Sequence, residues 1–158
     1  MNALIVYDSQ FGNTERIATA IADTLRTSGD VRSLRADPAH PLDLEHVDLL
    51  ILGCPTQGWR PTKAMQALLT NLSPEQLHGR AIACFDTRFQ KPRWLTGSAA
   101  KVMASRFQQM GVTLLVSPES FFVKGTEGPL LPGELGRAAV WARVLFSKLE
   151  TPRPVMQR

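Results

Sequence analysis

The chain opens with the stretch from Ala3 to Glu15, ALIVYDSQFGNTE, in which five apolar residues run directly into a polar loop. A short apolar run without polar alternation is typical of a strand buried on both faces of a sheet. Ile17, Ile21 and Leu25 follow at helical spacing. The opening residues therefore predict a strand, a short connection and a helix.

The same alternation continues to the end of the chain. Helical spacing of apolar residues recurs in the segments 65–72, 99–110 and 135–149, whereas the segment 37–46 is too short and Pro-rich for more than a turn or two of helix. Strands that alternate with helices imply an α/β fold with parallel strands and right-handed crossovers. Four further strands are predicted from Val31 to Leu34, Val47 to Leu52, Ala81 to Phe85 and Val112 to Val116. Because all five runs are nearly continuous in apolar character, we expect every strand to be buried on both faces.

Length and composition favour one globular domain. The chain has 158 residues, of which 44% are hydrophobic and 20% charged, as in ordinary globular proteins. We expect one domain over residues 1–150 and a loose tail over residues 151–158. No apolar run approaches the ~20 residues of a membrane span, and the first residues lack a secretory leader pattern. These features lead us to expect a cytoplasmic protein with no membrane span.

The chemistry-bearing residues argue against several classes of function. Cys54 and Cys84 lie in or next to expected buried strands, so we expect them to be reduced core thiols. Neither they nor the three histidines have the spacing of a zinc or iron–sulfur site, and we expect no metal. The net charge of +4 permits an anionic partner. Because the basic residues are spread along the chain without a recognition motif, we expect no nucleic-acid partner.

In open parallel sheets, ligands bind at the carboxyl ends of the strands, where the strand order reverses. The loop after the first strand combines hydroxyl and amide groups, a glycine and the free N–H groups of a helix start, which together suit an anion. The alternative is that Asn13 or Thr14 merely caps the helix. The Walker lysine and the G-x-G-x-x-G fingerprint are both missing. The phosphate of a mononucleotide remains as the expected ligand.

The pattern Ser-x-x-Gly-Asn-Thr-Glu after a first strand resembles the phosphate loop of flavodoxins and of the flavodoxin-like domains of flavodiiron proteins. The resemblance implies a three-layer α/β/α sandwich with a five-stranded parallel sheet in the order 2-1-3-4-5, and one non-covalently bound FMN. Residues 116–124 lack the insertion of long-chain flavodoxins, so the chain resembles the short-chain form. The phosphate-loop positions are Ser9, Gln10, Phe11, Gly12, Asn13 and Thr14, with Phe11 standing where well-known flavodoxins have Thr.

The third strand runs into GCPTQGW, which resembles the second flavin loop of the family. In that loop an aromatic residue flanks the isoalloxazine ring, and a glycine peptide can turn toward flavin N5. The resemblance implies that Trp59 covers one face of the ring. A core role for Trp59 is the alternative, which its glycine and arginine neighbours disfavour. The residues expected at the flavin are Pro55, Thr56, Gln57, Gly58 and Trp59.

A long loop is expected after the fourth strand, and long loops in compact domains are usually functional or disordered. It resembles the third flavodoxin loop, in which an acidic residue follows the strand and an aromatic residue stacks on the flavin. The alternative is that Thr96 or Ser98 caps the next helix and the aromatics are exposed by accident. We expect the segments 128–130 and 133–135, a turn and a helix start, to lie far from the cleft. The residues expected at the cofactor are Asp86, Thr87, Arg88, Phe89, Trp94 and Gly97, with Phe89 or Trp94 as the stacking aromatic.

The resemblance implies an electron-transfer protein whose partner is a redox protein or a small-molecule electron acceptor. An FMN-dependent NAD(P)H:quinone-type oxidoreductase on the same fold is the alternative, because fold does not fix function. The cations Arg60, Arg88, Lys91 and Arg93 would suit an anionic partner, or they are solvated rim charges. A response-regulator receiver is disfavoured, because Gly53 and Cys54 stand where its phosphoacceptor aspartate would be.

Overall fold

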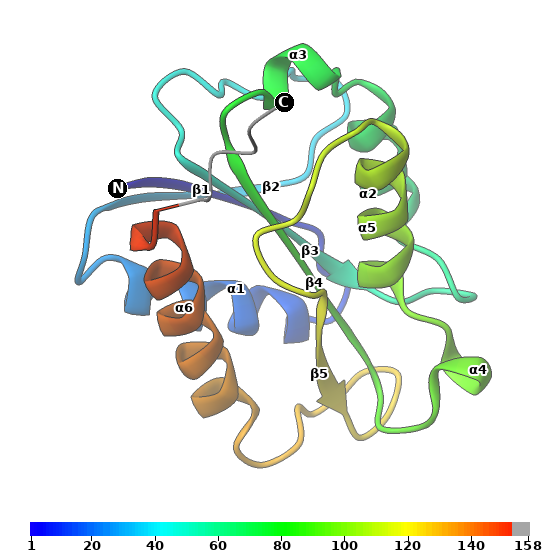
Figure 1. The fold of residues 1–158 in the computed structure, drawn as a ribbon. Coiled ribbons are helices and arrows are strands. Elements are labelled where there is room, and N and C mark those ends of the chain that lie inside the picture. Colours follow the sequence, from blue (N-terminus) through cyan, green and yellow to red (C-terminus); the bar gives the residue numbers. More distant parts are fainter. Residues whose placement is uncertain (153–158) are drawn as a thin grey trace.

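A five-stranded parallel sheet forms the centre of the computed structural model, which describes residues 1–152 (Figure 1). The strand order is β2-β1-β3-β4-β5, which confirms the predicted α/β class and topology. Residues 153–158 of the predicted tail lie outside the described residues. The strands are β1 (Asn2–Tyr7), β2 (Asp30–Arg35), β3 (Leu49–Pro55), β4 (Ala81–Phe89) and β5 (Glu119–Val123).

Helices cover both faces of this sheet and give the expected three layers (Figure 1). Buried side chains of α1 and α6 pack on one face, and those of α2 and α5 pack on the other. Two short helices, α3 and α4, lie in connections. Among the described residues no helix is long and apolar enough to cross a membrane. The helices are α1 (Asn13–Leu25), α2 (Lys63–Thr70), α3 (Pro74–Leu77), α4 (Arg93–Thr96), α5 (Ala99–Gln109) and α6 (Glu134–Glu150).

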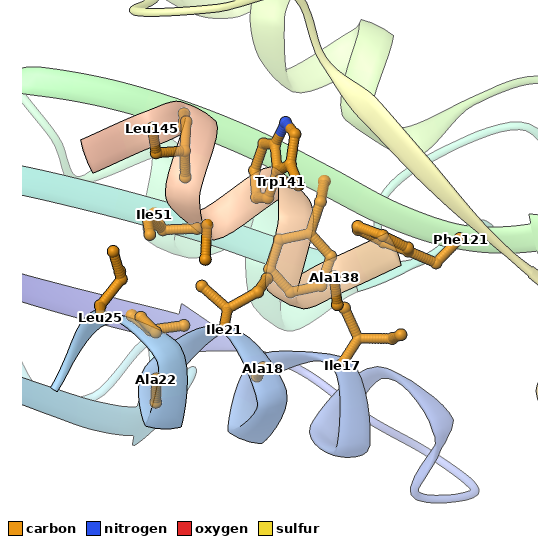
Figure 2. Packing of buried hydrophobic residues seen from close by; sticks show 14 of the residues in the cluster. Ile17, Ala18, Ile21, Ala22, Leu25, Ile51, Phe121, Ala138, Trp141 and Leu145 are labelled. Carbon is orange, nitrogen blue, oxygen red and sulfur yellow. The ribbon is translucent and has the colours of Figure 1, made fainter. Parts of the chain in front are cut away.

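The core between the sheet and the pair α1 and α6 anchors the start of α1 (Figure 2). Ile17 and Ile21 project from α1 toward Trp141 of α6 and toward the sheet. Phe85, Phe121 and Trp141 meet edge to edge, with ring centroids 5.9–6.1 Å apart, a favourable aromatic geometry. This packing fixes the first turn of α1 at the carboxyl ends of the strands.

The fifth strand is not where the sequence pattern predicts it. Val112 to Val116 form an irregular segment that contacts the sheet through one backbone hydrogen bond, from Leu115 N–H to the Ile82 carbonyl. Its apolar side chains are partly buried against both cores. The strand is Glu119–Val123, which pairs with the last five residues of β4. The prediction for 112–116 was wrong because both segments are apolar, and only the second reaches a free edge of the sheet.

Two other strands also differ from expectation. β4 continues four residues past Phe85, because Asp86, Thr87 and Arg88 are buried and pair with β5. These residues therefore belong to a strand and not to the predicted loop. β2 is an edge strand with mostly exposed side chains, so the expectation that every strand is buried on both faces was wrong for β2.

Candidate functional site

A cavity of about 560 Å³ opens at the carboxyl ends of the strands, a volume typical of cofactor pockets. Its walls come from the loops after β1, β3 and β4, as predicted, and also from the last residues of β3, β4 and β5 and the segment after β5. Gly12, Asp86, Trp94 and Gly97 are predicted site residues that do not line it. The predicted residues that do line it are Ser9, Gln10, Phe11, Asn13, Thr14, Pro55, Thr56, Gln57, Gly58, Trp59, Thr87, Arg88 and Phe89.

The loop after β1 presents unpaired donors to the cavity. The backbone N–H groups of Gln10, Phe11, Asn13 and Thr14 donate no hydrogen bond to any group within residues 1–152. The Ser9 hydroxyl oxygen instead accepts from the N–H groups of Gly12 and Glu15, at 3.1 and 3.3 Å, which leaves its own proton free. Free N–H groups at a helix N-terminus attract anions. We refer to residues 9–14 as the phosphate cradle, after the ligand that the sequence predicts for this loop.

The N-cap residue of α1 has no side chain that could cap the helix. Gly12 is its N-cap residue, with a φ of 89°, and no side-chain cap hydrogen bond is formed. Asn13 and Thr14 therefore do not cap the helix, and the simple capping alternative was wrong. Thr14 instead turns its hydroxyl toward the Thr87 hydroxyl, 2.8 Å away in the buried floor of the cavity. The backbone N–H groups of Asn13 and Thr14 are left available for a ligand.

The loop after β3 forms a tight turn at the cavity rim. Gln57 and Arg60 exchange two backbone hydrogen bonds, of 2.8 and 3.0 Å. The two residues between them, Gly58 and Trp59, have φ angles of 53° and 68°, the geometry of a type I′ turn. A positive φ is unfavourable for a bulky residue such as Trp. Contacts from the neighbouring loop must hold Trp59 there.

The 90s loop, residues 90–98, supplies those contacts. The Trp59 indole N–H donates to the Leu95 carbonyl at 2.8 Å, and Trp59 remains 60% exposed. A Cβ atom on Gly97 would lie 2.5 Å from Trp59 Cα, so only glycine permits this approach. Gly97 therefore shapes the site from behind the cavity wall. Trp59 is not a core residue, as its sequence neighbours indicated.

The aromatic residues of the third loop have different surroundings. Phe89 lines the cavity, whereas Trp94 is 76% exposed on α4 and does not. Of the two predicted stacking candidates, only Phe89 is in position to contact a ligand in the cavity. Phe11 also lines the cavity, so three aromatic side chains surround it.

Asp86 is buried behind the cavity and contacts α5. Its Oδ2 accepts from the Ser98 hydroxyl at 2.5 Å and from the Ala100 N–H at 3.0 Å. The Ser98 oxygen accepts from the Lys101 N–H, so Ser98 caps α5, as the alternative interpretation expected. Asp86 Oδ1 has no hydrogen-bond partner within residues 1–152. Its contacts assign Asp86 to anchoring α5, which lies beside the site.

Arg88 is a nearly buried cation in the cavity wall, 9% exposed. Its Nε donates to the Ser120 hydroxyl at 2.9 Å, and its Nη1 donates to the Lys91 carbonyl at 2.7 Å. It forms no ion pair within residues 1–152. Burial lowers the pKa of Arg88, although the nearby Asp86 opposes this. Because a buried charge without an ion pair is costly, an anionic group in the cavity would stabilise Arg88.

Lys91 also lines the cavity, whereas Arg60 and Arg93 are exposed outside it. The cavity residues that were not predicted to bind the cofactor are Lys91, Leu95, Thr96, Val123 and Thr126. The first three belong to the long loop after β4, for which a functional role was expected. Val123 and Thr126 could not be found, because their place depends on the true position of β5.

The segment after β5 approaches the phosphate cradle. The Asn13 amide Nδ2 donates to the Glu127 carbonyl at 3.2 Å, and Gly128 lies directly against the Asn13 side chain. The expectation that residues 128–130 lie far from the cleft was therefore wrong. It failed because β5 ends at Val123 and brings the following residues to the carboxyl edge of the sheet.

Both cysteines are free and buried, as predicted. Burial raises the pKa of the Cys54 thiol to about 12 and also raises that of Cys84. Buried, protonated thiols are poor nucleophiles. Neither cysteine lines the cavity, so both belong to the core.

An anion cradle at the switch point of a doubly wound sheet is the arrangement of a mononucleotide-binding α/β protein. Comparison with known proteins narrows the class. The chain belongs to the flavodoxin family, whose model, described as flavodoxin, matches residues 5–128. The chain is 29% identical to a flavodoxin of Megasphaera elsdenii over 114 residues, which are 70% of this chain and 80% of that protein.

Solved structures show the same fold. Oxidised Flavodoxin 2 from Bacillus cereus superposes with a TM-score of 0.75 at 23% identity, covering 94% of this chain and 99% of that one. Rubredoxin oxygen:oxidoreductase from Desulfovibrio gigas gives 0.72 at 18% identity, covering 95% of this chain and 37% of that one. The family assigns flavin binding and electron transfer to this chain, as its sequence predicted.

Proposed function

We propose that the chain binds one FMN non-covalently in the cavity, with the phosphate in the cradle of residues 9–14. The unpaired N–H groups of Gln10, Phe11, Asn13 and Thr14 carry this proposal. Four donors without protein acceptors around one helix start match the oxygens of a terminal phosphate. The single cradle favours a mononucleotide over FAD.

The rest of the cavity suits a flat, partly apolar ring. Trp59 of the loop after β3 and Phe89 at the end of β4 present aromatic surface, and Pro55 and Leu95 add apolar contact. Thr56, Gln57 and Thr87 supply polar groups for the ring edges. Bound FMN supplies electron transfer through its ring, so the protein needs to bind, orient and tune it. No catalytic acid or base is part of this proposal.

Arg88 and Lys91 give the cavity a positive wall. Both cations lie on the β4 side, and Arg88 is fixed by hydrogen bonds to Ser120 and Lys91. A fixed positive charge beside a bound flavin favours its anionic reduced form, because opposite charges attract more strongly in a poorly hydrated site. We therefore expect a higher reduction potential here than in a homologue with acidic surroundings.

The partner that we propose offers negative charge. Residues 55–118 hold only two acids, Glu75 and Asp86, and Asp86 is buried. Arg60 and Arg93 are exposed next to the exposed Trp59 and Trp94 in the sequence, and Trp and Arg are typical of residues that dominate protein interfaces. The redox partner would be an acidic protein or an anionic small molecule. The cations of this region are Arg60, Lys63, Arg80, Arg88, Lys91, Arg93, Lys101 and Arg106.

The alternative is an FMN-dependent oxidoreductase that takes electrons directly from NAD(P)H. Lys91 favours it, because this exposed cation at the cavity edge could bind a nucleotide phosphate. In either case, the buried free thiols Cys54 and Cys84 support a reducing, cytoplasmic setting.

The visible spectrum of the purified protein, followed through stepwise reduction, tests the proposal. We expect a flavin spectrum, one FMN per chain on extraction, and re-oxidation by an added electron acceptor. A protein that stays colourless after incubation with FMN would refute FMN binding. Rapid flavin reduction by NADPH or NADH alone would instead support the oxidoreductase.

A further inference from the structure

We propose that the β5–α6 segment, residues 124–128, completes the phosphate cradle by holding the Asn13 side chain toward the bound phosphate. This inference rests on the proposed FMN site. It assigns a positioning role to Gly128 and a ligand contact to Thr126, neither of which lies in the three loops identified from the sequence.

The contact between Gly128 and Asn13 is close. A Cβ atom on Gly128 would lie 2.6 Å from Asn13 Oδ1 and 2.9 Å from its Nδ2. Only a residue without a side chain allows the amide to lie there. Gly128 also has a φ of 102°, which glycine adopts at little cost. The backbone and the side-chain contact both require glycine at this position.

The Asn13 amide is also held by Glu127. Nδ2 donates one hydrogen to the Glu127 carbonyl, and an amide nitrogen carries two. The second hydrogen is free for an acceptor at the cavity, which Asn13 lines. A donor that is already held in place loses less side-chain entropy when it binds a ligand. The segment thus prepares Asn13 to contact a phosphate oxygen.

The segment that holds Asn13 is itself well anchored. Lys124 N–H donates to the Pro129 carbonyl at 2.9 Å, and Gly128 N–H donates to the Gly125 carbonyl at 3.0 Å. Leu131 N–H donates to the Phe122 carbonyl of β5 at 2.9 Å. Thr126, within this framework, lines the cavity, and its hydroxyl makes no hydrogen bond within residues 1–152. A bound phosphate would give that hydroxyl an acceptor.

The test compares FMN with riboflavin, which has the same ring but no phosphate. Gly128→Ala would displace the Asn13 amide, the flexible end of a side chain, so the fold should survive. Gly111→Ala is the matched control, because Gly111 also has a positive φ, 77°, but nothing within 4 Å of its Cβ position. Dissociation constants for both flavins are measured by flavin fluorescence on the apoprotein, with melting temperatures alongside.

We expect Gly128→Ala to weaken FMN binding about tenfold, which corresponds to ~1.4 kcal/mol, and to change riboflavin binding less than twofold. Gly111→Ala should change neither. Asn13→Ala should reproduce the FMN loss, and adding Gly128→Ala to it should cause little further loss. Thr126→Val should weaken FMN binding alone.

Equal losses for FMN and riboflavin, or additive losses in the double variant, would overturn the inference while leaving the proposed function intact. If Gly128→Ala does not fold, the FMN-to-riboflavin ratio of Asn13→Ala and Thr126→Val decides in its place. A wild-type protein that binds no FMN would overturn the proposed function and this inference together.

Discussion

The hydroxyl groups of Thr14 and Thr87 lie 2.8 Å apart, and both are buried in the floor of the cavity. This contact joins the first turn of α1 to the end of β4, two segments that are 73 positions apart in the sequence. This hydrogen bond therefore links the phosphate cradle to the β4 residues that line the cavity. The polar residues of β4 are part of the site because the strand extends this far.

Changing Thr14 to Leu should abolish FMN binding, because Leu adds bulk to the cradle and leaves the Thr87 hydroxyl without its partner. We expect the affinity to fall at least about a hundredfold, ~2.7 kcal/mol, as measured by fluorescence titration. Thr19→Leu, at an exposed position of the same helix, is the control. Retained tight binding by the Thr14 variant would exclude a phosphate at this place.

Changing Gly97 to Ala should separate the second and third loops. The new Cβ would lie 2.5 Å from Trp59 Cα, a backbone atom that cannot move easily. We expect a loss of about 1–3 kcal/mol in the free energy of unfolding, as for other overpacked sites, together with weaker flavin binding. Urea denaturation measures the free energy of unfolding, and fluorescence titration measures flavin binding. Gly79→Ala is the control. Gly79 also has a positive φ but open space around its Cβ position, so this variant should lose only the stability that the strained backbone costs.

Changing Arg88 to Gln should lower the reduction potential of the bound flavin, because it removes the fixed positive charge from the cavity wall. We expect a decrease of roughly 60 mV for the second electron, which corresponds to a tenfold change in that equilibrium. Arg88→Lys keeps the charge and is the control, and Arg93→Gln removes an exposed charge outside the cavity. Equal potentials in all four proteins would show that Arg88 serves only to anchor the 90s loop.

The rate of reduction by an anionic donor should fall as salt is added, because exposed charges are screened beyond about 8 Å at physiological ionic strength. Changing Arg60 and Lys91 to Glu should slow this reaction and reverse its salt dependence. Lys148→Glu, on α6, is the control, because it changes the charge at a site outside residues 55–118. The rate of flavin reduction is measured by stopped-flow absorbance at several salt concentrations. If the rate depends on salt in the same way for all variants, Arg60 and Lys91 do not attract the donor and are only solvated surface charges.

The thiols of Cys54 and Cys84 should resist alkylation in the folded protein. Burial raises the pKa of Cys54 from 9.0 to about 12, so the native state holds its proton more tightly than the unfolded state does. The contribution of this pKa difference to the free energy of unfolding is fully present below pH 9 and is lost as the pH rises toward 12. Labelling at pH 8 should be slow in buffer and complete in urea. Fast labelling in buffer would contradict the core assignment.

The sequence was most informative where local pattern and tertiary role coincide. The apolar runs of β1 and β3 and the helical spacing of α1 and α6 are sufficient to predict a doubly wound sheet. The phosphate cradle could be predicted because its groups are adjacent in the chain. β5 could not be placed, since two neighbouring apolar segments compete and the free edge beside β4 decides between them.

The remaining site residues depend on contacts between distant segments. Arg88 is buried because Ser120, 32 positions away, accepts its hydrogen bond. Gly128 reaches Asn13 only after β5 has found its place. Asp86 looks like a ligand residue in the sequence, yet its partners Ser98 and Ala100 belong to the start of α5. Such pairings are set by the assembled sheet and leave no local signal.

Titration of the apoprotein with FMN, riboflavin and FAD under the same conditions tests the central claim most directly. The unpaired donors of the phosphate cradle predict one FMN per chain, bound at least about tenfold more tightly than riboflavin, ~1.4 kcal/mol. FAD should bind less tightly than FMN, because the cavity offers one cradle and no second phosphate loop. Equal affinities for FMN and riboflavin, or no binding of either, would contradict the account.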